Sequence, residues 1–175
     1  MGRVMRGGVV LLAVITAIAI VEPPVARAQL YFDVLACRKL EPGTQSGFFF
    51  LRYSQCGTQF TAKDPYIGLV AHLRNVREYT RVAVEILDPA QTVVWKREAR
   101  YETTSGTYYP NIWIGAVLPV GADVAAIASE NVRLTANIIR LADKPAVERP
   151  GEWLVRAQAD RAGPRTLTFT LLSGP

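Results

Sequence analysis

The stretch "GEWLVRAQADRAGPRTLTFTL", residues 151–171, contains two runs of alternating apolar and polar side chains around a short polar turn. The apolar positions that share one face are Trp153, Val155, Ala157, Ala159, Leu167, Phe169 and Leu171. A period of two is typical of half-buried β-strands, because successive side chains of a strand point to opposite faces. The stretch therefore predicts a β-hairpin whose tryptophan and phenylalanine belong to the core.

The same period recurs upstream and predicts further strands. Residues 66–73 alternate, and residues 80–101 alternate on both sides of the turn sequence "DPAQ", which predicts a second hairpin. We also expect strands over 112–118 and 132–140, and a short alanine-rich helix over 122–129. Several short strands with little helix predict an all-β protein, a single antiparallel β-sandwich.

A family resemblance supports this fold class. The stretches "FTAKDPYIGLVAHLRNV", "RVAVEILDPAQTVVW" and "RPGEWLVRAQADRAGPRTLTFTL" together resemble a small immunoglobulin-like or fibronectin-like domain of bacterial exported proteins. The resemblance implies an immunoglobulin-like sandwich. It implies no catalytic residues, because the shared motifs are structural.

The first 28 residues have the organisation of a secretory signal peptide. Arg3 and Arg6 precede an apolar run over 7–21, and Ala26 and Ala28 stand in the small-x-small arrangement that signal peptidase recognises. A membrane anchor is the alternative, but the run is about 15 residues long and a span needs roughly 20. We therefore expect cleavage after Ala28 and export to the periplasm or the medium.

Removal of that segment leaves residues 29–175 as one domain. It takes away three basic residues and one acidic residue, so the formal net charge falls from +5 to +3. Such a charge is ordinary for a soluble protein and gives no reason to expect a nucleic-acid partner. We expect no transmembrane segment in the mature chain.

The chain has two cysteines, Cys37 and Cys56. In an oxidising compartment they should pair, and the bridge would close the loop over 38–55, which contains Pro42 and two glycines. The alternative is a lipid anchor on Cys37, because "VLAC" loosely resembles a lipobox. The 15 residues between the apolar run and Cys37 argue against that alternative.

The residues that usually carry catalysis or bind metals are scarce. His72 is the only histidine, and its position within a predicted strand favours a structural role. We expect no metal, no cofactor and no enzymatic activity. A hydrolase that uses a carboxylate pair is the remaining catalytic alternative. Its candidate residues are Asp64, Glu85, Asp88, Glu98 and Glu102.

Aromatic residues are the best candidates for a binding surface. Strand alternation cannot place three consecutive phenylalanines, at positions 48–50, on one face, so the loop, a partner or a ligand must cover part of them. The candidate binding residues are Phe48, Phe49, Tyr53, Tyr108 and Tyr109. A basic set could instead meet anionic envelope polymers or form a solvated sheet face. It consists of Arg74, Arg77, Arg81, Lys96, Arg97 and Arg100.

The function expected from these features is that of a non-catalytic exported domain that binds a protein partner or supports the cell envelope. The alternative is a carbohydrate-binding module that uses the aromatic residues and recognises cell-envelope polysaccharide. Exposed aromatic rings stack on sugars and also anchor protein contacts, so the residue types alone leave both open.

Overall fold

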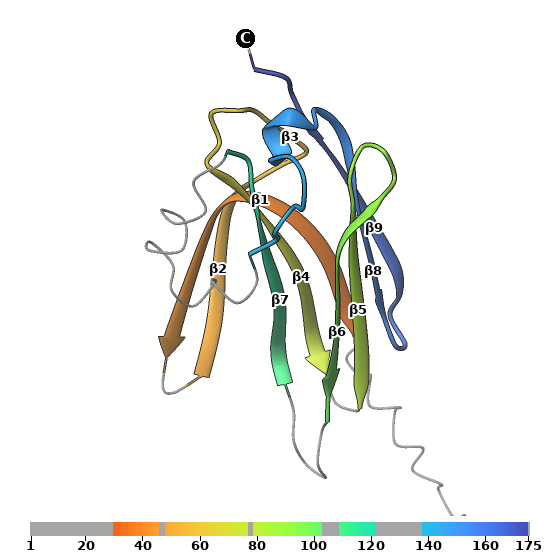
Figure 1. Ribbon diagram of the computed structural model, residues 1–175. Coiled ribbons are helices and arrows are strands. Elements are labelled where there is room, and N and C mark those ends of the chain that lie inside the picture. Colours follow the sequence, from red (N-terminus) through yellow and green to blue (C-terminus); the bar gives the residue numbers. More distant parts are fainter. Residues whose placement is uncertain (1–29, 46–47, 77–78, 103–108, 122–137, 175) are drawn as a thin grey trace, which may run out of the picture.

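The computed structural model describes residues 30–45, 48–76, 79–102, 109–121 and 138–174, and β-strands dominate them (Figure 1). A short 3₁₀ helix, η2, interrupts the strands before the final hairpin. The elements are β1 (Tyr31–Gln45), β2 (Phe48–Cys56), β3 (Gln59–Phe60), β4 (Tyr66–Val76), β5 (Thr80–Leu87), β6 (Val93–Tyr101), β7 (Tyr109–Pro119), η2 (Ala146–Glu148), β8 (Gly151–Ala159) and β9 (Gly163–Leu171). The all-β prediction is confirmed.

The strands form two sheets that face each other as a β-sandwich. Sheet A has the order β2-β1-β4-β7, and sheet B has the order β3-β9-β8-β5-β6. All neighbours are antiparallel except β3 and β9, whose two-residue pairing is parallel. The expectation of a purely antiparallel sandwich is therefore corrected at this edge, where Gln59–Phe60 runs alongside the last strand in the same direction.

The main core lies between the two sheets and follows the predicted alternation. Trp153 and Phe169 are register partners on β8 and β9, both are fully buried, and their rings stack with centroids 6.2 Å apart. The indole Nε1 of Trp153 donates a hydrogen bond to the Arg149 carbonyl at 3.1 Å. This bond satisfies the only polar atom of the side chain, so the whole ring can be buried without an unpaired donor.

The turn between β5 and β6 is fixed by a buried carboxylate. Asp88 Oδ1 accepts hydrogen bonds from the backbone N–H groups of Ala90 and Thr92, both at 3.0 Å. Arg149 Nη1 contacts Asp88 Oδ2 at 2.8 Å, and both side chains of this ion pair are largely buried. The predicted hairpin over residues 80–101 is confirmed, and its turn is tied to the segment that precedes β8.

The prediction of a loop between the two cysteines is wrong. Residues 38–45 and 48–55 belong to two paired strands, and β1 and β2 pair from Cys37 and Cys56 to Gln45 and Phe48. Figure 1 shows β1 as a long, bent strand that arches across the molecule before it joins β2. Its first half pairs with β4 and its second half pairs with β2, so one strand of 15 residues serves two neighbours in succession.

Several sequence predictions fall outside the described residues. These are the signal peptide over 1–28, the helix over 122–129 and most of the strand over 132–140. The described end of that last segment makes a single parallel bridge, between Ile138 and Val117 of β7, and Ile139 N donates to the Val117 carbonyl at 2.8 Å.

Candidate functional site

The β1–β2 hairpin covers the outer face of sheet A. The alternation of residues 66–73 instead predicts a strand with one face in solvent. Leu40 of the hairpin lies against Gly68 of β4, where a Cβ atom would overlap the leucine side chain. Leu51 lies over Gly115 of β7, 3.3 Å from the position a Cβ would take there. Because neither glycine has a Cβ atom, the hairpin can pack close to the sheet at both positions.

This contact builds a second, smaller hydrophobic cluster outside the main core. Its buried members are Cys37, Leu40, Leu51, Tyr66, Val70 and Val117, and Leu35, Tyr53, Trp113 and Ile138 pack against it. The predicted disulfide between Cys37 and Cys56 is confirmed, and it joins the two strands of the hairpin at the edge of this cluster. A thioether-linked lipid on Cys37 is incompatible with this bridge, because the sulfur is already bonded.

His72 lies at the open end of this cluster, with both ring nitrogens hydrogen-bonded. Nε2 is 2.9 Å from Asn111 Oδ1, and Nδ1 is 3.0 Å from the Tyr53 hydroxyl. Since the amide oxygen can only accept, Nε2 carries a hydrogen and donates it to Asn111. The Tyr53 hydroxyl can donate to Nδ1 when the ring is neutral and accept from it when the ring is protonated. The histidine thus holds a β2 residue and a β7 residue in one network.

Burial is the main cause of the lowered pKa of His72. The nearby Arg74 guanidinium lowers this pKa further, while the Asn111 hydrogen bond and the Asp33 carboxylate oppose the shift. The side chain is only 4% exposed, which explains why desolvation of the charged form dominates. The structural role expected for the only histidine agrees with this geometry.

Two aromatic rings flank the imidazole. Trp113 is the register partner of His72 across β4 and β7, and its ring stacks on the imidazole with centroids 5.4 Å apart. Tyr53 approaches edge-on, with centroids 6.0 Å apart and ring planes at 74°. Trp113 and Tyr53 are both half-buried, so each keeps part of its surface at the solvent boundary.

These side chains line a groove of about 430 Å³. Its lining residues are Glu41, Leu51, Arg52, Tyr53, Ser54, His72 and Trp113. Glu41 and Arg52 are direct register partners on the hairpin, and Lys39 contacts the Glu41 carboxylate at 2.6 Å. The hydrogen bond and the charge of Lys39 lower the pKa of Glu41, so the carboxylate is ionised at neutral pH. The groove therefore combines aromatic walls with a rim that carries both charges.

The candidate binding residues predicted from the sequence do not converge on one surface. Tyr53 lies in the groove. Tyr109 packs against the main core on the opposite face of sheet A, and its hydroxyl donates to the Glu102 carbonyl at 3.4 Å. Phe48 and Phe49 are placed in β2 by their backbone, but their side chains lie outside the described set, as does Tyr108. Sequence reasoning missed His72 as a groove residue, and it did not place Trp113 beside Tyr53.

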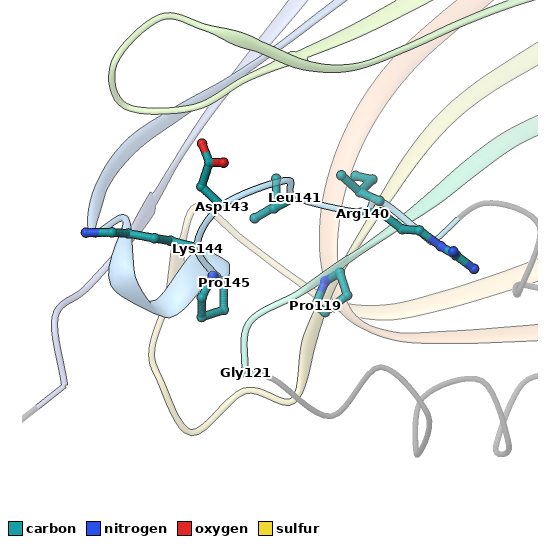
Figure 2. Close-up of a pocket in the computed structure, with 8 residues that line it drawn as sticks. Pro119, Gly121, Arg140, Leu141, Asp143, Lys144 and Pro145 are labelled. Atoms are coloured by element: carbon teal, nitrogen blue, oxygen red, sulfur yellow. The ribbon is translucent and has the colours of Figure 1, made fainter.

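A second hollow lies at one end of the sandwich, beyond β7, with a volume of about 420 Å³ (Figure 2). It is lined by Pro119, Gly121, Ile139, Arg140, Leu141, Asp143, Lys144 and Pro145. Figure 2 shows the charged ends of Arg140 and Lys144 pointing away from each other and from Asp143. A ligand site needs polar groups that converge, so this hollow is the weaker candidate.

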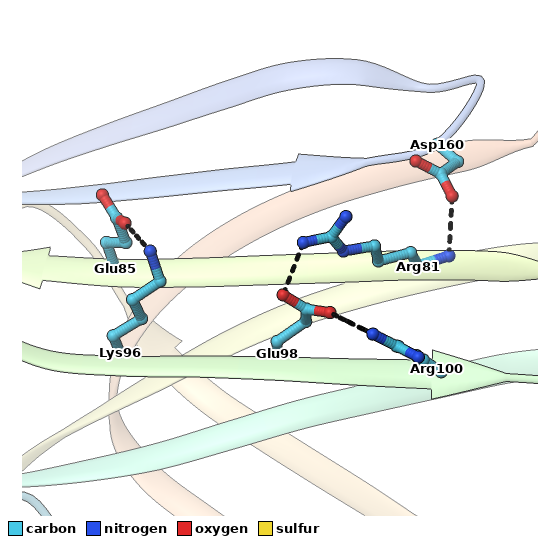
Figure 3. Close-up of polar contacts among 6 residues, drawn as sticks. All are labelled: Arg81, Glu85, Lys96, Glu98, Arg100 and Asp160. Atoms are coloured by element: carbon cyan, nitrogen blue, oxygen red, sulfur yellow. Dashed lines mark hydrogen bonds and ion pairs between the residues drawn. The ribbon is translucent and has the colours of Figure 1, made fainter.

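The outer face of sheet B carries ion pairs between β5 and β6 and within β6 (Figure 3). Glu98 contacts Arg81 at 2.7 Å and Arg100 at 3.4 Å, and Lys96 contacts Glu85 at 2.7 Å. These contacts explain the depressed pKa of both glutamates, in each case chiefly through the hydrogen bond to the cation. Five members of the predicted basic and acidic sets are therefore paired with one another on a solvated face.

Two of the remaining carboxylates considered for acid–base catalysis, Asp64 and Asp88, make structural bonds. Asp64 accepts from Arg38 Nε and from the Thr61 backbone N–H, both at 2.8 Å. Asp88 fixes the turn after β5, and the exposed Glu102 follows β6. In the part of the chain that the structure describes, no cluster of three histidine, cysteine or carboxylate side chains could hold a metal ion.

No protein-family model matches the chain, and no curated protein matches it either. Within the described ranges, no helix has the length and apolar character that crossing a bilayer requires.

Proposed function

We propose that this chain is a non-catalytic exported domain with an immunoglobulin-like β-sandwich, and that it binds a protein partner through the groove on sheet A. The order β3-β9-β8-β5-β6, with β3 parallel to β9, supports the immunoglobulin-like topology. The antiparallel order β1-β4-β7 supports it as well, because it corresponds to strands A, B and E of the ABED sheet of that fold. The hairpin partner β2 is then an addition at the sheet edge.

Export is supported by the cysteine chemistry. A disulfide persists in oxidising compartments such as the bacterial periplasm and the extracellular medium, and it is rare in the reducing cytosol. The Cys37–Cys56 bridge fits that environment. The signal peptide expected over residues 1–28 would deliver the chain there.

The observation that carries the binding proposal is one groove whose lining includes both aromatic and charged residues. Tyr53 and Trp113 offer aromatic surface, and Glu41 and Arg52 offer opposite charges at the rim. Half-buried aromatic residues with nearby charged groups are typical of the anchors of protein interfaces. The outer face of sheet B provides no comparable surface, because its charges are paired and its strands present polar residues.

The direct test is site-specific photo-crosslinking in extracts of the native cell envelope. A benzoyl-phenylalanine replaces Ser54 at the groove rim, and in a control protein it replaces Thr168, which is exposed on sheet B. We expect a discrete protein adduct from position 54 and none from position 168. Equal labelling at both positions, or adducts from position 168 alone, would contradict the proposed site.

Carbohydrate binding is the second candidate function, and the Trp113–His72 stack favours it. A flat aromatic surface beside a carboxylate, a guanidinium and the Ser54 hydroxyl can stack on a sugar ring and bond its hydroxyl groups. Calorimetric titration with neutral and acidic oligosaccharides from the envelope tests this candidate. Saturable heat that disappears in Trp113→Leu but persists in Trp95→Leu would favour the carbohydrate over the protein partner.

A further inference from the structure

The outer face of sheet A continues beyond the groove as two rows of register partners across β1, β4 and β7. The outer row consists of Tyr31, Arg74 and Asn111, and the inner row consists of Asp33, His72 and Trp113. Phe32, Leu73 and Ile112 alternate with these residues and belong to the main core, so both rows face outward. The inner row borders the groove through His72 and Trp113, and all three side chains of the outer row are exposed.

Arg74 brings a positive charge to the middle of the outer row. Its guanidinium carbon lies 5.2 Å from the centre of the Tyr31 ring, and no carboxylate of the described residues forms an ion pair with it. The Asp33 carboxylate accepts instead from the Tyr31 hydroxyl at 3.1 Å and from the Val34 backbone N–H at 2.8 Å. A guanidinium that contacts an aromatic ring keeps the N–H groups of its edge for other hydrogen bonds.

Asn111 adds amide N–H donors beside this charge. Its Oδ1 atom accepts from His72 Nε2 at 2.9 Å, which fixes the amide and leaves both Nδ2 hydrogens to donate elsewhere. Asn111 is the register partner of Arg74, and directly opposed residues of an antiparallel pair have Cβ atoms about 5 Å apart. Strand β4 separates this pair from the Asp33 carboxylate on β1. The two neighbouring side chains therefore present hydrogen-bond donors and one positive charge.

We propose that Arg74 and Asn111 form a carboxylate-binding subsite, and that it receives an aspartate or glutamate side chain of the protein partner that occupies the groove. This inference rests on the proposed function and names a chemical group that the partner carries. A carboxylate accepts two parallel hydrogen bonds from a guanidinium and has lone pairs left for an amide N–H. Tyr31 contacts the arginine and His72 holds the asparagine, so little side-chain freedom is lost on binding.

The donors of the subsite favour an acidic side chain over an acidic sugar. An ionised carboxylate only accepts hydrogen bonds, so it matches a surface that offers donors. The carboxylate of an acidic sugar is surrounded by hydroxyl groups, which also need acceptors. In the outer row the Asn111 oxygen already accepts from His72, and the Tyr31 hydroxyl already donates to Asp33. A single carboxylate on a flexible side chain fits this row better.

The test titrates the ¹⁵N-labelled exported protein with N-acetyl-glutamate methylamide at neutral pH and constant ionic strength, followed by nuclear magnetic resonance. This probe carries one carboxylate and no other charge, and N-acetyl-glutamine methylamide is its neutral control. We expect saturable shifts of the Arg74 Nε–H and Asn111 Nδ2 signals with the glutamate probe alone. Arg156 and Gln158 should stay in place as the internal control. They are an exposed arginine and an exposed amide on one face of β8, where Glu85 is the register partner of Arg156.

Substitutions at the exposed Arg74 sharpen the experiment. Arg74→Gln should weaken binding of the glutamate probe by about tenfold, because the charge-assisted hydrogen bonds are lost. Arg74→Lys keeps the charge without the planar fork, so its affinity should lie between those of Arg74→Gln and the parent. Arg156→Gln removes an exposed arginine from sheet B and should bind as the parent does. Absence of a saturable shift, equal shifts with the glutamine probe, or full affinity in Arg74→Gln would overturn the inference.

The outcomes separate this inference from the proposed function. If position 54 crosslinks to a protein equally well in the parent and in Arg74→Gln, the groove binds that protein and the acidic contact is wrong. If position 54 yields no adduct while the glutamate probe binds at Arg74, the carboxylate subsite stands and the proposed function fails. If the methyl glycoside of glucuronic acid binds more tightly than the glutamate probe, the ligand is an acidic sugar and the inference as stated is wrong.

Discussion

Trp113 stacks on His72 across the β4–β7 pair, with ring centroids 5.4 Å apart and ring planes 20° apart. The two residues are 41 positions apart in the sequence, and only the pairing of β4 with β7 brings them together. Tyr53 closes the same cluster from β2 through its hydrogen bond to the imidazole. The groove therefore depends on three strands and on the packing of the hairpin against sheet A.

Gly68 should be the residue on which the packing of the hairpin against sheet A depends most. A Cβ at position 68 would overlap Leu40, so Gly68→Ala must push the hairpin away from β4. Overpacking of this kind typically costs about 1–3 kcal/mol, which urea denaturation would measure. The control is Gly57→Ala, because a Cβ at position 57 meets nothing within 4 Å. Full stability of Gly68→Ala would show that the hairpin does not pack as described.

The disulfide should contribute strongly to the stability of the hairpin. Replacement of Cys37 and Cys56 together by alanine should lower the free energy of unfolding by about 2–5 kcal/mol. Both thiols in the native protein should resist alkylation until a reductant is added, as measured by mass spectrometry. The double variant provides the control, since reductant should leave its melting temperature unchanged. Rapid alkylation of the untreated exported protein would contradict the bridge.

Trp153 should be essential to the main core. The ring is fully buried and stacked on Phe169, so Trp153→Ala should cost about 3–5 kcal/mol and unfold much of the protein. Trp153→Phe keeps an aromatic ring and should cost less, although it leaves the Arg149 carbonyl without its donor. Thermal unfolding followed by near-ultraviolet circular dichroism measures both variants. A Trp153→Ala protein that keeps its melting temperature would refute the core assignment.

His72 should make the protein less stable in mild acid. Its pKa is lowered in the folded state, chiefly by burial, from an unfolded value of about 6.5. Between these two pKa values the unfolded chain binds more protons, so the free energy of unfolding falls as the pH decreases through 6.5. Above that range both states are neutral and the residue contributes no pH dependence.

Urea denaturation between pH 5 and pH 8 tests this prediction, with His72→Gln as the control. The variant lacks the titrating ring but keeps polar groups near Tyr53 and Asn111. The slope of the unfolding free energy against pH should be shallower in the variant below pH 6.5, because all other titrating groups are shared. Identical slopes in the two proteins would show that His72 titrates alike in both states.

Sequence periodicity predicted the two sequential hairpins well, because each depends on local alternation and on a turn such as the one at Asp88. It failed for the β1–β2 hairpin, where β1 bends across the sheet edge. Phe32, Val34 and Ala36 pack into the main core, whereas Leu40 packs onto the outer face of sheet A. Alternation shows which side chains share a face of a strand. It does not show which part of the protein that face packs against once the strand bends.

The groove could not be predicted from the sequence for a related reason. Tyr53 was among the predicted binding residues because exposed aromatic residues are frequent at interfaces. His72 has the sequence context of an ordinary strand position, and its pairing with Trp113 spans about 40 residues that carry no local signal of it. The glycines at 68 and 115 were the available hint, since glycine within a strand often marks a close approach of another segment.

The groove on sheet A is the central claim, and nuclear magnetic resonance of the indole N–H groups tests it most directly. The chain has three tryptophans, so the ¹⁵N-labelled protein offers three indole signals that can be assigned by substitution. On titration with the partner captured through position 54, the Trp113 signal should shift, while those of Trp95 on sheet B and of the buried Trp153 should stay in place. A stationary Trp113 signal with a shifted Trp95 signal would place binding on the other sheet and contradict the account.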